Sequence, residues 1–140
     1  MGDSTEIDGR SSGQVEVRVR VTDTDLMGVV YNSVYLVWFE IGRTELMRSR
    51  GIAYAEVETR GISLPVTEAR FRVRQPARYD DLLRIETSVM ARRSRGVSFA
   101  YRIFREDHLL VEGETTHVAV RHADGRSCAL PEWLKDPLKC

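Results

Sequence analysis

The feature that most restricts the fold is a helix-like segment without a polar face. Residues 34–39 read VYLVWF, and good helix formers follow as far as Gly51. Ser33 suits the N-cap position, Arg48 suits the negative end of the helix dipole, and Gly51 suits the position just past the end. A helix is therefore expected over residues 33–50. Because its first half is apolar on every side, this helix should be buried nearly all round.

Runs of β-like sequence surround this helix. Residues 15–21 read VEVRVRV, which alternates apolar and polar residues with the period of a half-buried strand. Four more β-like runs follow, joined by connections short enough for antiparallel hairpins: ISLPVTEARFRVRQ, LLRIETSVMA, VSFAYRIFRE and LLVEGETTHVAVR. This order favours an α+β fold in which about five antiparallel strands curl around one long buried helix. A helix on a flat sheet is the alternative, but that packing leaves the apolar helix half exposed.

The length of the chain fits one domain. It has 140 residues, of which 42% are hydrophobic and 30% are charged, and such a domain needs neither metals nor disulfides to bury a core. We expect a single domain over residues 15–140, preceded by a flexible polar tail over residues 1–14. The tail lacks the apolar core of a secretory signal, and no apolar run approaches the length of a membrane span. These features predict a cytoplasmic protein.

Charge and cysteine content exclude several classes of function. Lys and Arg together number 21, as do Asp and Glu, so a net charge of zero gives no electrostatic drive toward nucleic acid. Cys128 and Cys140 are the only cysteines, and neither has neighbours suited to a metal site. His108, His117 and His122 also lack ligands at metal spacing, so we expect them to be surface or packing residues. Neither a metal nor a separate cofactor is predicted.

Two carboxylates lie between the first strand and the helix. The turn TDTDLMGVVYN places Asp23 and Asp25 just ahead of the helix start, where unpaired N–H groups and the helix dipole favour negative charge. A carboxylate beside such donors can attack a carbonyl carbon or activate water, while the N–H groups stabilise the oxyanion. On spacing alone, capping of the turn is the more common role of Asp at such a junction.

A longer pattern around these carboxylates is specific. The stretch DTDLMGVVYNSVYLVWFEIGRTELMRSRG, residues 23–51, resembles the signature of the 4-hydroxybenzoyl-CoA thioesterase family, including its Tol–Pal-associated acyl-CoA thioesterases. The resemblance continues through LPVTEARFRVRQPARYDDLLRIET and LPEWL, so it covers about residues 15–134. It implies the hotdog fold, with the sheet wrapped around the helix. It also implies a homodimer or homotetramer in which protomers pair edge to edge and the active sites lie at their interface.

The resemblance further implies hydrolysis of an acyl thioester to a free acid and a thiol. The catalytic carboxylate of the family matches Asp25, as nucleophile or as general base, and Asp23 then looks structural. Backbone N–H groups at Asn32 or Ser33 match the oxyanion hole. Coenzyme A enters as part of the substrate. Relatives nearest the Tol–Pal branch often have His where this chain has Asn32, and Asn cannot act as an acid or base, so a mechanism that needs His is not expected.

Further contacts with the substrate are expected at three places. The acyl pocket is expected to involve residues near the helix start and at the following strand: Tyr31, Tyr35, Val66 and Thr67. Arg92, Arg93 and Arg95 lie at a hairpin end, where guanidinium groups suit the phosphates of coenzyme A. By contrast, the alternating Arg70, Arg72 and Arg74 are expected to share a solvated face of one strand.

Two other functions remain compatible with these residues. An acyl carrier protein could present the thioester, because an Arg-rich rim suits an acidic carrier as well as coenzyme A. A non-catalytic acyl-CoA sensor would need an added effector segment, and residues 1–14 are too short for a DNA-binding one. A hydratase would want a paired Asp and His, which Asn32 argues against. The acyl chain and the choice between dimer and tetramer are left open by the sequence.

Overall fold

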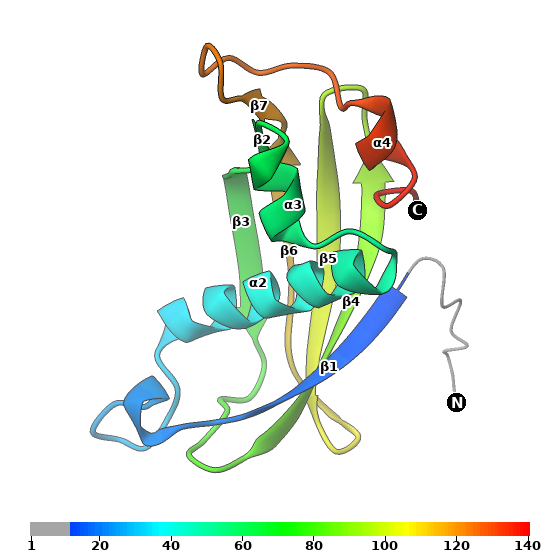
Figure 1. Cartoon of the computed structure of the whole chain (residues 1–140). Coiled ribbons are helices and arrows are strands. Elements are labelled where there is room, and N and C mark those ends of the chain that lie inside the picture. The colour runs from blue at the N-terminus through cyan, green and yellow to red at the C-terminus, as the bar shows by residue number, and fades with distance from the viewer. Residues whose placement is uncertain (1–11) are drawn as a thin grey trace.

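A computed structural model describes residues 12–140 as an antiparallel sheet crossed by one long helix (Figure 1). The sheet has five strands in the order β1-β4-β5-β6-β3. The strands span β1 Ser12–Arg18, β3 Val66–Val73, β4 Leu82–Arg92, β5 Gly96–Arg105 and β6 His108–Val118. The helix α2, Asn32–Ser49, lies across one face. The α+β architecture predicted from the sequence is confirmed.

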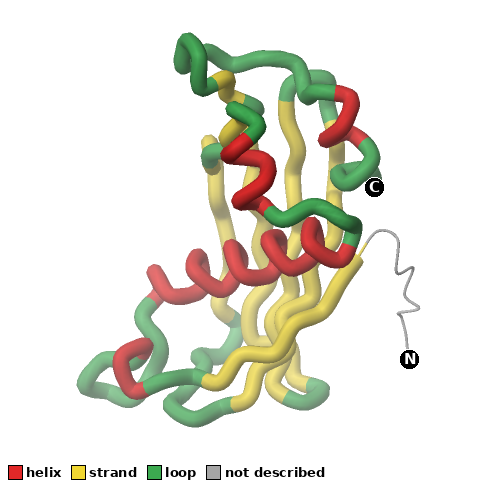
Figure 2. The backbone as a smooth tube through the Cα atoms, viewed as in Figure 1, coloured by secondary structure: helices red, strands yellow, loops and turns green. Residues whose placement is uncertain are grey.

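Shorter elements complete the chain. They are the 3-10 turn η1 Val21–Asp23, the helices α3 Tyr54–Thr59 and α4 Glu132–Lys135, and the paired strands β2 Ile62–Ser63 and β7 Val120–Arg121. Figure 2 shows that α3, α4, β2 and β7 gather at the end of the sheet opposite the loop that precedes α2. None of the helices within the described residues is long and apolar enough to cross a bilayer.

Several element boundaries differ from expectation. Residues 1–11 of the expected tail lie outside the described residues, while residues 12–14 already belong to β1. The segment AEVETRG, expected to be a connection, is mostly the helix α3, and EWLK forms α4. The predicted N-cap at Ser33 is wrong, because α2 begins at Asn32 with Tyr31 as its N-cap. Gly51 takes the left-handed φ of +95° expected just past the helix.

The helix is seated closely on the sheet. The Phe39 ring stacks on Tyr101 of β5 with 4.2 Å between centroids. At Gly42 of α2, an added Cβ would lie 2.3 Å from Thr87 Oγ1 of β4. At Gly113 of β6, an added Cβ would lie 2.8 Å from Phe39 Cζ. Both contacts are shorter than any side chain tolerates, so the two glycines allow α2 and the sheet to approach each other.

The exposed side of α2 departs from expectation. Leu36 is 39% exposed and Val37 is 49% exposed, so the prediction of a helix buried nearly all round is wrong for the single chain. The sheet covers one side of the helix only, and the amino-terminal end of α2 extends beyond the edge strand β3 (Figure 1). This edge therefore presents an apolar helix face beside unpaired strand backbone.

Candidate active site

Asp25 lies in a tight loop between η1 and α2. Its backbone N–H donates to the Val29 carbonyl at 2.9 Å, and Gly28, with φ +80°, closes the turn. The carboxylate oxygen Oδ1 accepts from the Met27 N–H at 2.8 Å and the Val29 N–H at 3.3 Å. These are the local bonds that an Asp–Gly turn favours. Within residues 12–140 the second oxygen, Oδ2, has no hydrogen-bond partner, so it is available for chemistry.

Asp23 anchors the start of this loop. Its side chain is only 3% exposed, and it accepts hydrogen bonds from the Arg20 N–H at 2.9 Å and from the Arg20 guanidinium at 2.9 Å. Burial acts to raise the pKa of Asp23, but the hydrogen bonds and charge of Arg20 outweigh it, and the pKa is lowered. The Asp23 carbonyl also accepts from the Tyr31 N–H at 3.0 Å. This buried pairing supports the structural role expected for Asp23.

A second anchor comes from the segment before β4. The Val30 N–H donates to the Ala77 carbonyl at 2.9 Å, and Val29 forms an isolated β-bridge with Arg78. The Ala77 N–H donates in turn to the Tyr35 hydroxyl at 3.0 Å. Tyr35, expected in the acyl pocket, is 0% exposed and lies in the core. Its hydroxyl therefore ties the loop to the helix.

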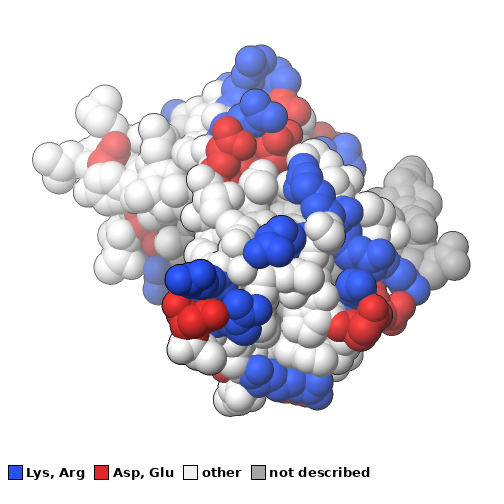
Figure 3. Space-filling model, turned by 90° about the horizontal axis from the view of Figure 1, so that it is seen from above, with Lys and Arg blue, Asp and Glu red and all other residues white. Residues whose placement is uncertain are grey.

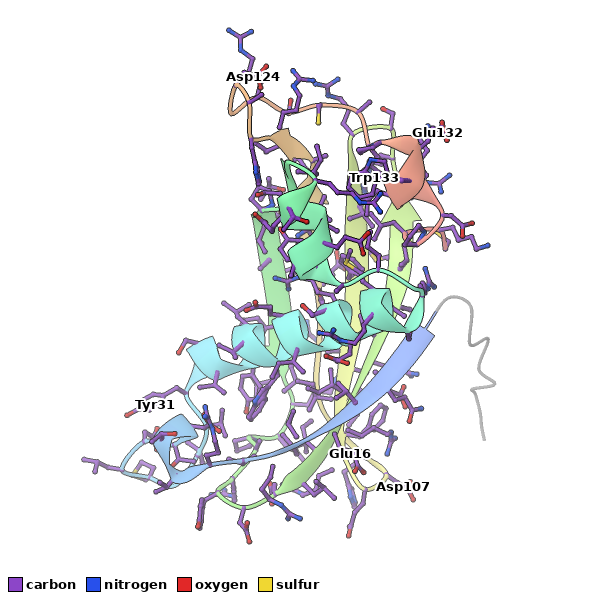
Figure 4. All side chains as sticks on the ribbon, in the orientation of Figure 1. Glu16, Tyr31, Asp107, Asp124, Glu132 and Trp133 are labelled. Atoms are coloured by element: carbon purple, nitrogen blue, oxygen red, sulfur yellow. The ribbon has the colours of Figure 1, made fainter. Side chains whose placement is uncertain are left out.

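The amino-terminal end of α2 is open. The N-cap Tyr31 makes no side-chain capping bond, and the Val34 N–H bonds back to the Tyr31 carbonyl at 3.0 Å. Among the described residues, no acceptor meets the backbone N–H groups of Asn32 or Ser33, and both residues are exposed. The Tyr31 side chain points away from the sheet (Figure 4). Unpaired donors at the positive end of an 18-residue helix suit an oxyanion.

Two cavities lie between α2 and the start of β3. One, of about 260 Å³, is bordered by Leu36, Val37 and Val66, together with Glu40, Arg43, Ala69 and Thr115. The other, of about 250 Å³, reaches inward to Phe99 and His117 and also borders Val66. The Thr67 hydroxyl instead donates to the Thr116 carbonyl at 3.1 Å, beside a register shift in β3. Asp25 borders neither cavity, so one chain does not bring the expected site residues together.

The three arginines expected at the coenzyme A phosphates lie at the β4–β5 hairpin. This hairpin is at the opposite end of the sheet from the Asp25 loop (Figure 1). Arg92 donates to the Lys135 carbonyl at 2.6 Å, Arg93 to Ser98 Oγ at 3.0 Å and Arg95 to the Ser127 carbonyl at 2.7 Å. All three remain exposed. Figure 3 looks down on this end and shows many Lys and Arg side chains with fewer acidic ones.

The alternating arginines along β3 and just after it are exposed, as expected, and two of them form ion pairs with β6. Arg70 pairs with Glu114 at 2.8 Å, and Arg74 pairs with Glu112. Arg72 is exposed between them. These side chains belong to the outer strand face, away from the cavities beside α2.

The fold also assembles a cluster that sequence reasoning missed. Ser63 Oγ lies 2.9 Å from Glu58 Oε2 and 2.8 Å from His122 Nε2, and that same ring nitrogen lies 3.3 Å from Glu58 Oε1. In a catalytic triad the hydroxyl and the carboxylate contact opposite nitrogens of the His ring. Here both contact Nε2, so this cluster does not have the geometry for nucleophilic catalysis. It joins α3 to the turn after β7. Across the described residues, no group of three or more His, Cys, Asp or Glu is placed to hold a metal ion.

A family model, sequence relatives and solved structures all match most of this chain. The model of the Thioesterase-like superfamily matches residues 19–138. An acyl-CoA thioester hydrolase, YbgC of Escherichia coli, is 33% identical over 117 residues, which cover 83% of this chain and 87% of that protein. A hypothetical protein from Thermus thermophilus has a TM-score of 0.86 at 36% identity, covering 89% of this chain and 95% of that one. A DHNA-CoA thioesterase from Staphylococcus aureus has a TM-score of 0.84 at 26% identity, covering 89% and 87%.

The Asp23 anchor predicts an acid-sensitive contribution to stability. Asp23→Asn removes the charge that Arg20 pairs with, so we expect the free energy of unfolding at neutral pH to fall by about 1–3 kcal/mol. Because the folded-state pKa of Asp23 is lowered from 3.8, this stabilisation is full above that pH and is lost as the pH falls through the folded-state value. Denaturant unfolding at several pH values should therefore show the two proteins converging in acid.

The control for this prediction is Asp124→Asn. Asp124 pairs with Arg121 at the same i,i+3 spacing and at 2.9 Å, but both side chains are exposed. Asp124→Asn should lower the free energy of unfolding much less than Asp23→Asn, since water screens exposed ion pairs. Equal losses for Asp23→Asn and Asp124→Asn would contradict the anchoring role of Asp23.

Proposed function

The chain belongs to the Thioesterase-like superfamily, and from this premise we propose that it hydrolyses acyl-CoA thioesters with Asp25 as the catalytic carboxylate. One observation carries the proposal. The anchored loop that holds Asp25, with its unbonded carboxylate oxygen Oδ2, leads directly into the uncapped start of α2. The thioesterase names of relatives in Escherichia coli and Haemophilus influenzae support the reaction class.

The chemistry follows from these two groups. As general base, Asp25 takes a proton from water, the resulting hydroxide adds to the thioester carbonyl carbon, and the C–S bond then breaks. As nucleophile, the carboxylate adds directly and water later hydrolyses the anhydride. In both routes the thiolate leaves and is protonated, and the products are the free acid and coenzyme A. The N–H groups of Asn32 and Ser33 stabilise the oxyanion formed on the carbonyl oxygen.

The working form in this proposal is a dimer that pairs its β3 edges. The edge strand β3 is exposed from Val66 to Arg70, and the apolar face formed by Leu36 and Val37 lies beside it. Antiparallel pairing of two β3 strands around a two-fold axis joins both sheets and reverses the partner end for end. Because the start of α2 extends past β3 (Figure 1), each Asp25 loop then lies over the partner, towards its α2–β3 cavities.

The same rotation brings the β4–β5 hairpin of one protomer toward the Asp25 loop of the other, because these features lie at opposite ends of a single chain (Figure 1). Arg92, Arg93 and Arg95 are then placed to contact the coenzyme A phosphates. Their intramolecular bonds occupy part of each guanidinium and hold it in position. A guanidinium has five N–H donors, so others remain for phosphate.

The first test replaces the proposed catalytic carboxylate. Asp25→Asn keeps the size of the side chain but removes the base, so thiol release from a panel of acyl-CoA esters should slow by about 100- to 10,000-fold. Asp107→Asn, an exposed turn carboxylate distant from the loop (Figure 4), is the control and should retain the rate. Full activity in Asp25→Asn would refute the assignment. Turnover only of esters presented on acyl carrier protein would instead identify a carrier-dependent thioesterase.

The second test removes one backbone donor. Asn32→Pro deletes the N–H at the first helical position, where proline is tolerated, and Tyr31 already has the extended backbone, φ −61° and ψ 142°, that precedes proline well. We expect kcat to fall by about 100- to 1,000-fold with an unchanged circular dichroism spectrum. Asn32→Ala, which keeps the N–H, should retain most of the rate. If both variants lose activity equally, the side chain rather than the backbone donor is required.

The third test concerns the dimer. Analytical ultracentrifugation should give a molar mass of twice the 16.0 kDa of the chain, or a higher even multiple. Val37→Asp places a charge on the apolar face and should shift the protein toward monomer with loss of thioester hydrolysis. Met90→Asp, at a β4 position of similar exposure, 44% against 49%, should change neither property. A fully active wild-type monomer would overturn the shared site.

A further inference from the structure

The inner cavity beside α2 is small and has one charged wall. Its volume of about 250 Å³ is below the range typical of drug-sized ligands. Met47, Leu64 and Phe99 supply apolar surface, while Arg43 lies on the helix side. The cavity shares Arg43 and Val66 with the outer cavity along α2 and β3, so the two are adjacent. A short chain entering over Val66 would end near Arg43.

Arg43 is half-buried without a carboxylate partner. Its one hydrogen bond is a long contact of 3.4 Å from Nη1 to the Tyr101 hydroxyl, and no acidic residue within residues 12–140 forms an ion pair with it. By contrast, Arg70 and Arg102 on the sheet pair with glutamates at 2.8 Å. Holding a guanidinium partly out of water without a counter-charge is unfavourable, so the site suits an anion that arrives with a ligand.

The groups behind Arg43 cannot supply further donors to a ligand. His117 Nδ1 lies 2.9 Å from the Leu64 carbonyl, which can only accept, so this nitrogen carries the proton and Nε2 is an acceptor. Burial lowers the pKa of His117 to about 4, which keeps the ring neutral at physiological pH. Nε2 therefore accepts from the Thr115 hydroxyl at 2.8 Å.

The same logic orders the rest of the chain of hydrogen bonds. Since the Thr115 proton is used on His117, its oxygen accepts from the Tyr101 hydroxyl at 2.6 Å. The Tyr101 oxygen then accepts from Arg43. All donors run one way, from Arg43 to the Leu64 carbonyl, and every hydroxyl proton along it is committed. Only Arg43 keeps N–H groups that are not used within this series of hydrogen bonds, and Tyr101, Thr115 and His117 hold its position.

Glu40 is the other charged residue at these cavities. It lies one helical turn before Arg43 and borders both cavities, but it is exposed and does not pair with Arg43, both residues being described. Water screens the charge of an exposed carboxylate more strongly than that of the half-buried guanidinium. The positive charge therefore dominates at the inner end.

We propose that the inner cavity binds the far end of the acyl group and that Arg43 selects acyl groups ending in a carboxylate, the half-thioesters of short dicarboxylic acids. This inference rests on the proposed acyl-CoA thioesterase function and specifies its substrate class. Arg43 is a specificity residue, and His117 positions it through Thr115 and Tyr101. A hydrocarbon end of the same length would leave the guanidinium without a partner in the cavity.

The test compares matched pairs of esters that differ only in the terminal carboxylate: succinyl-CoA with butyryl-CoA, and glutaryl-CoA with pentanoyl-CoA. For wild type, kcat/KM should be roughly 10- to 100-fold higher for the ester with the terminal carboxylate than for the hydrocarbon ester of the same pair. Arg43→Gln, which removes the charge, should lose that preference, because kcat/KM should fall more for succinyl-CoA and glutaryl-CoA than for their hydrocarbon counterparts. Arg43→Lys should retain part of it. Arg48→Gln, an exposed position on the same helix, is the control and should behave as wild type.

Binding separates failure of this inference from failure of the proposed function. The carboxybutyl and pentyl thioethers of coenzyme A cannot be hydrolysed, and their affinities for wild type and Arg43→Gln can be measured by calorimetry. An Arg43-dependent preference for the carboxybutyl thioether without turnover of any ester would keep the cavity assignment and refute the thioesterase proposal. Turnover with equal or better rates on hydrocarbon esters would refute the cavity assignment alone. If kcat/KM falls equally for both esters of a pair in a well-folded Arg43→Gln, the cavity assignment is likewise refuted.

Discussion

The close approach of α2 to the sheet is the constraint on which the rest of the molecule depends. Gly42 and Gly113 lie where an added Cβ would come within 2.3 Å of Thr87 Oγ1 and 2.8 Å of Phe39 Cζ, respectively. The helix can rest there only in one position along its axis, and that position leaves its amino-terminal end beyond β3. The anchors at Asp23 and Ala77 then hold the Asp25 loop against that end. Packing in the core thus determines where the Asp25 carboxylate and the start of α2 lie.

The regular parts of this fold were predictable because they follow from local periodicity. The alternation in VEVRVRV and the apolar run from Val34 to Phe39 identify a strand and a helix, and their order yields the α+β class. The short helices α3 and α4 were missed, since helices of six and four residues leave no periodic signal. The exposure of Leu36 and Val37 was also missed, because sequence reports that a helix face is apolar but not which molecule covers it.

For the candidate site, the sequence indicates residue types but not their arrangement in space. A carboxylate ahead of a helix start is visible in DTDLMG, as is the resemblance that singles out Asp25. The burial of Tyr35 and the linkage of Arg43, Tyr101, Thr115 and His117 were not visible. Arg43 and Tyr101 are 58 residues apart and meet only when α2 rests on β5, and no local pattern encodes such a meeting. His117 was expected to be a surface or packing residue, and it is indeed buried.

The open start of α2 has an evolutionary consequence. The donors there belong to the main chain, and a main-chain N–H survives every substitution except proline. Selection on such a site acts on the placement of the helix and on the loop that precedes it, while the side chain at position 32 is left comparatively free to drift. The Asn at position 32 is compatible with this arrangement, because the donor is the main-chain N–H and not the side chain. Lineages sharing the scaffold can accordingly diverge at the helix start without rebuilding it.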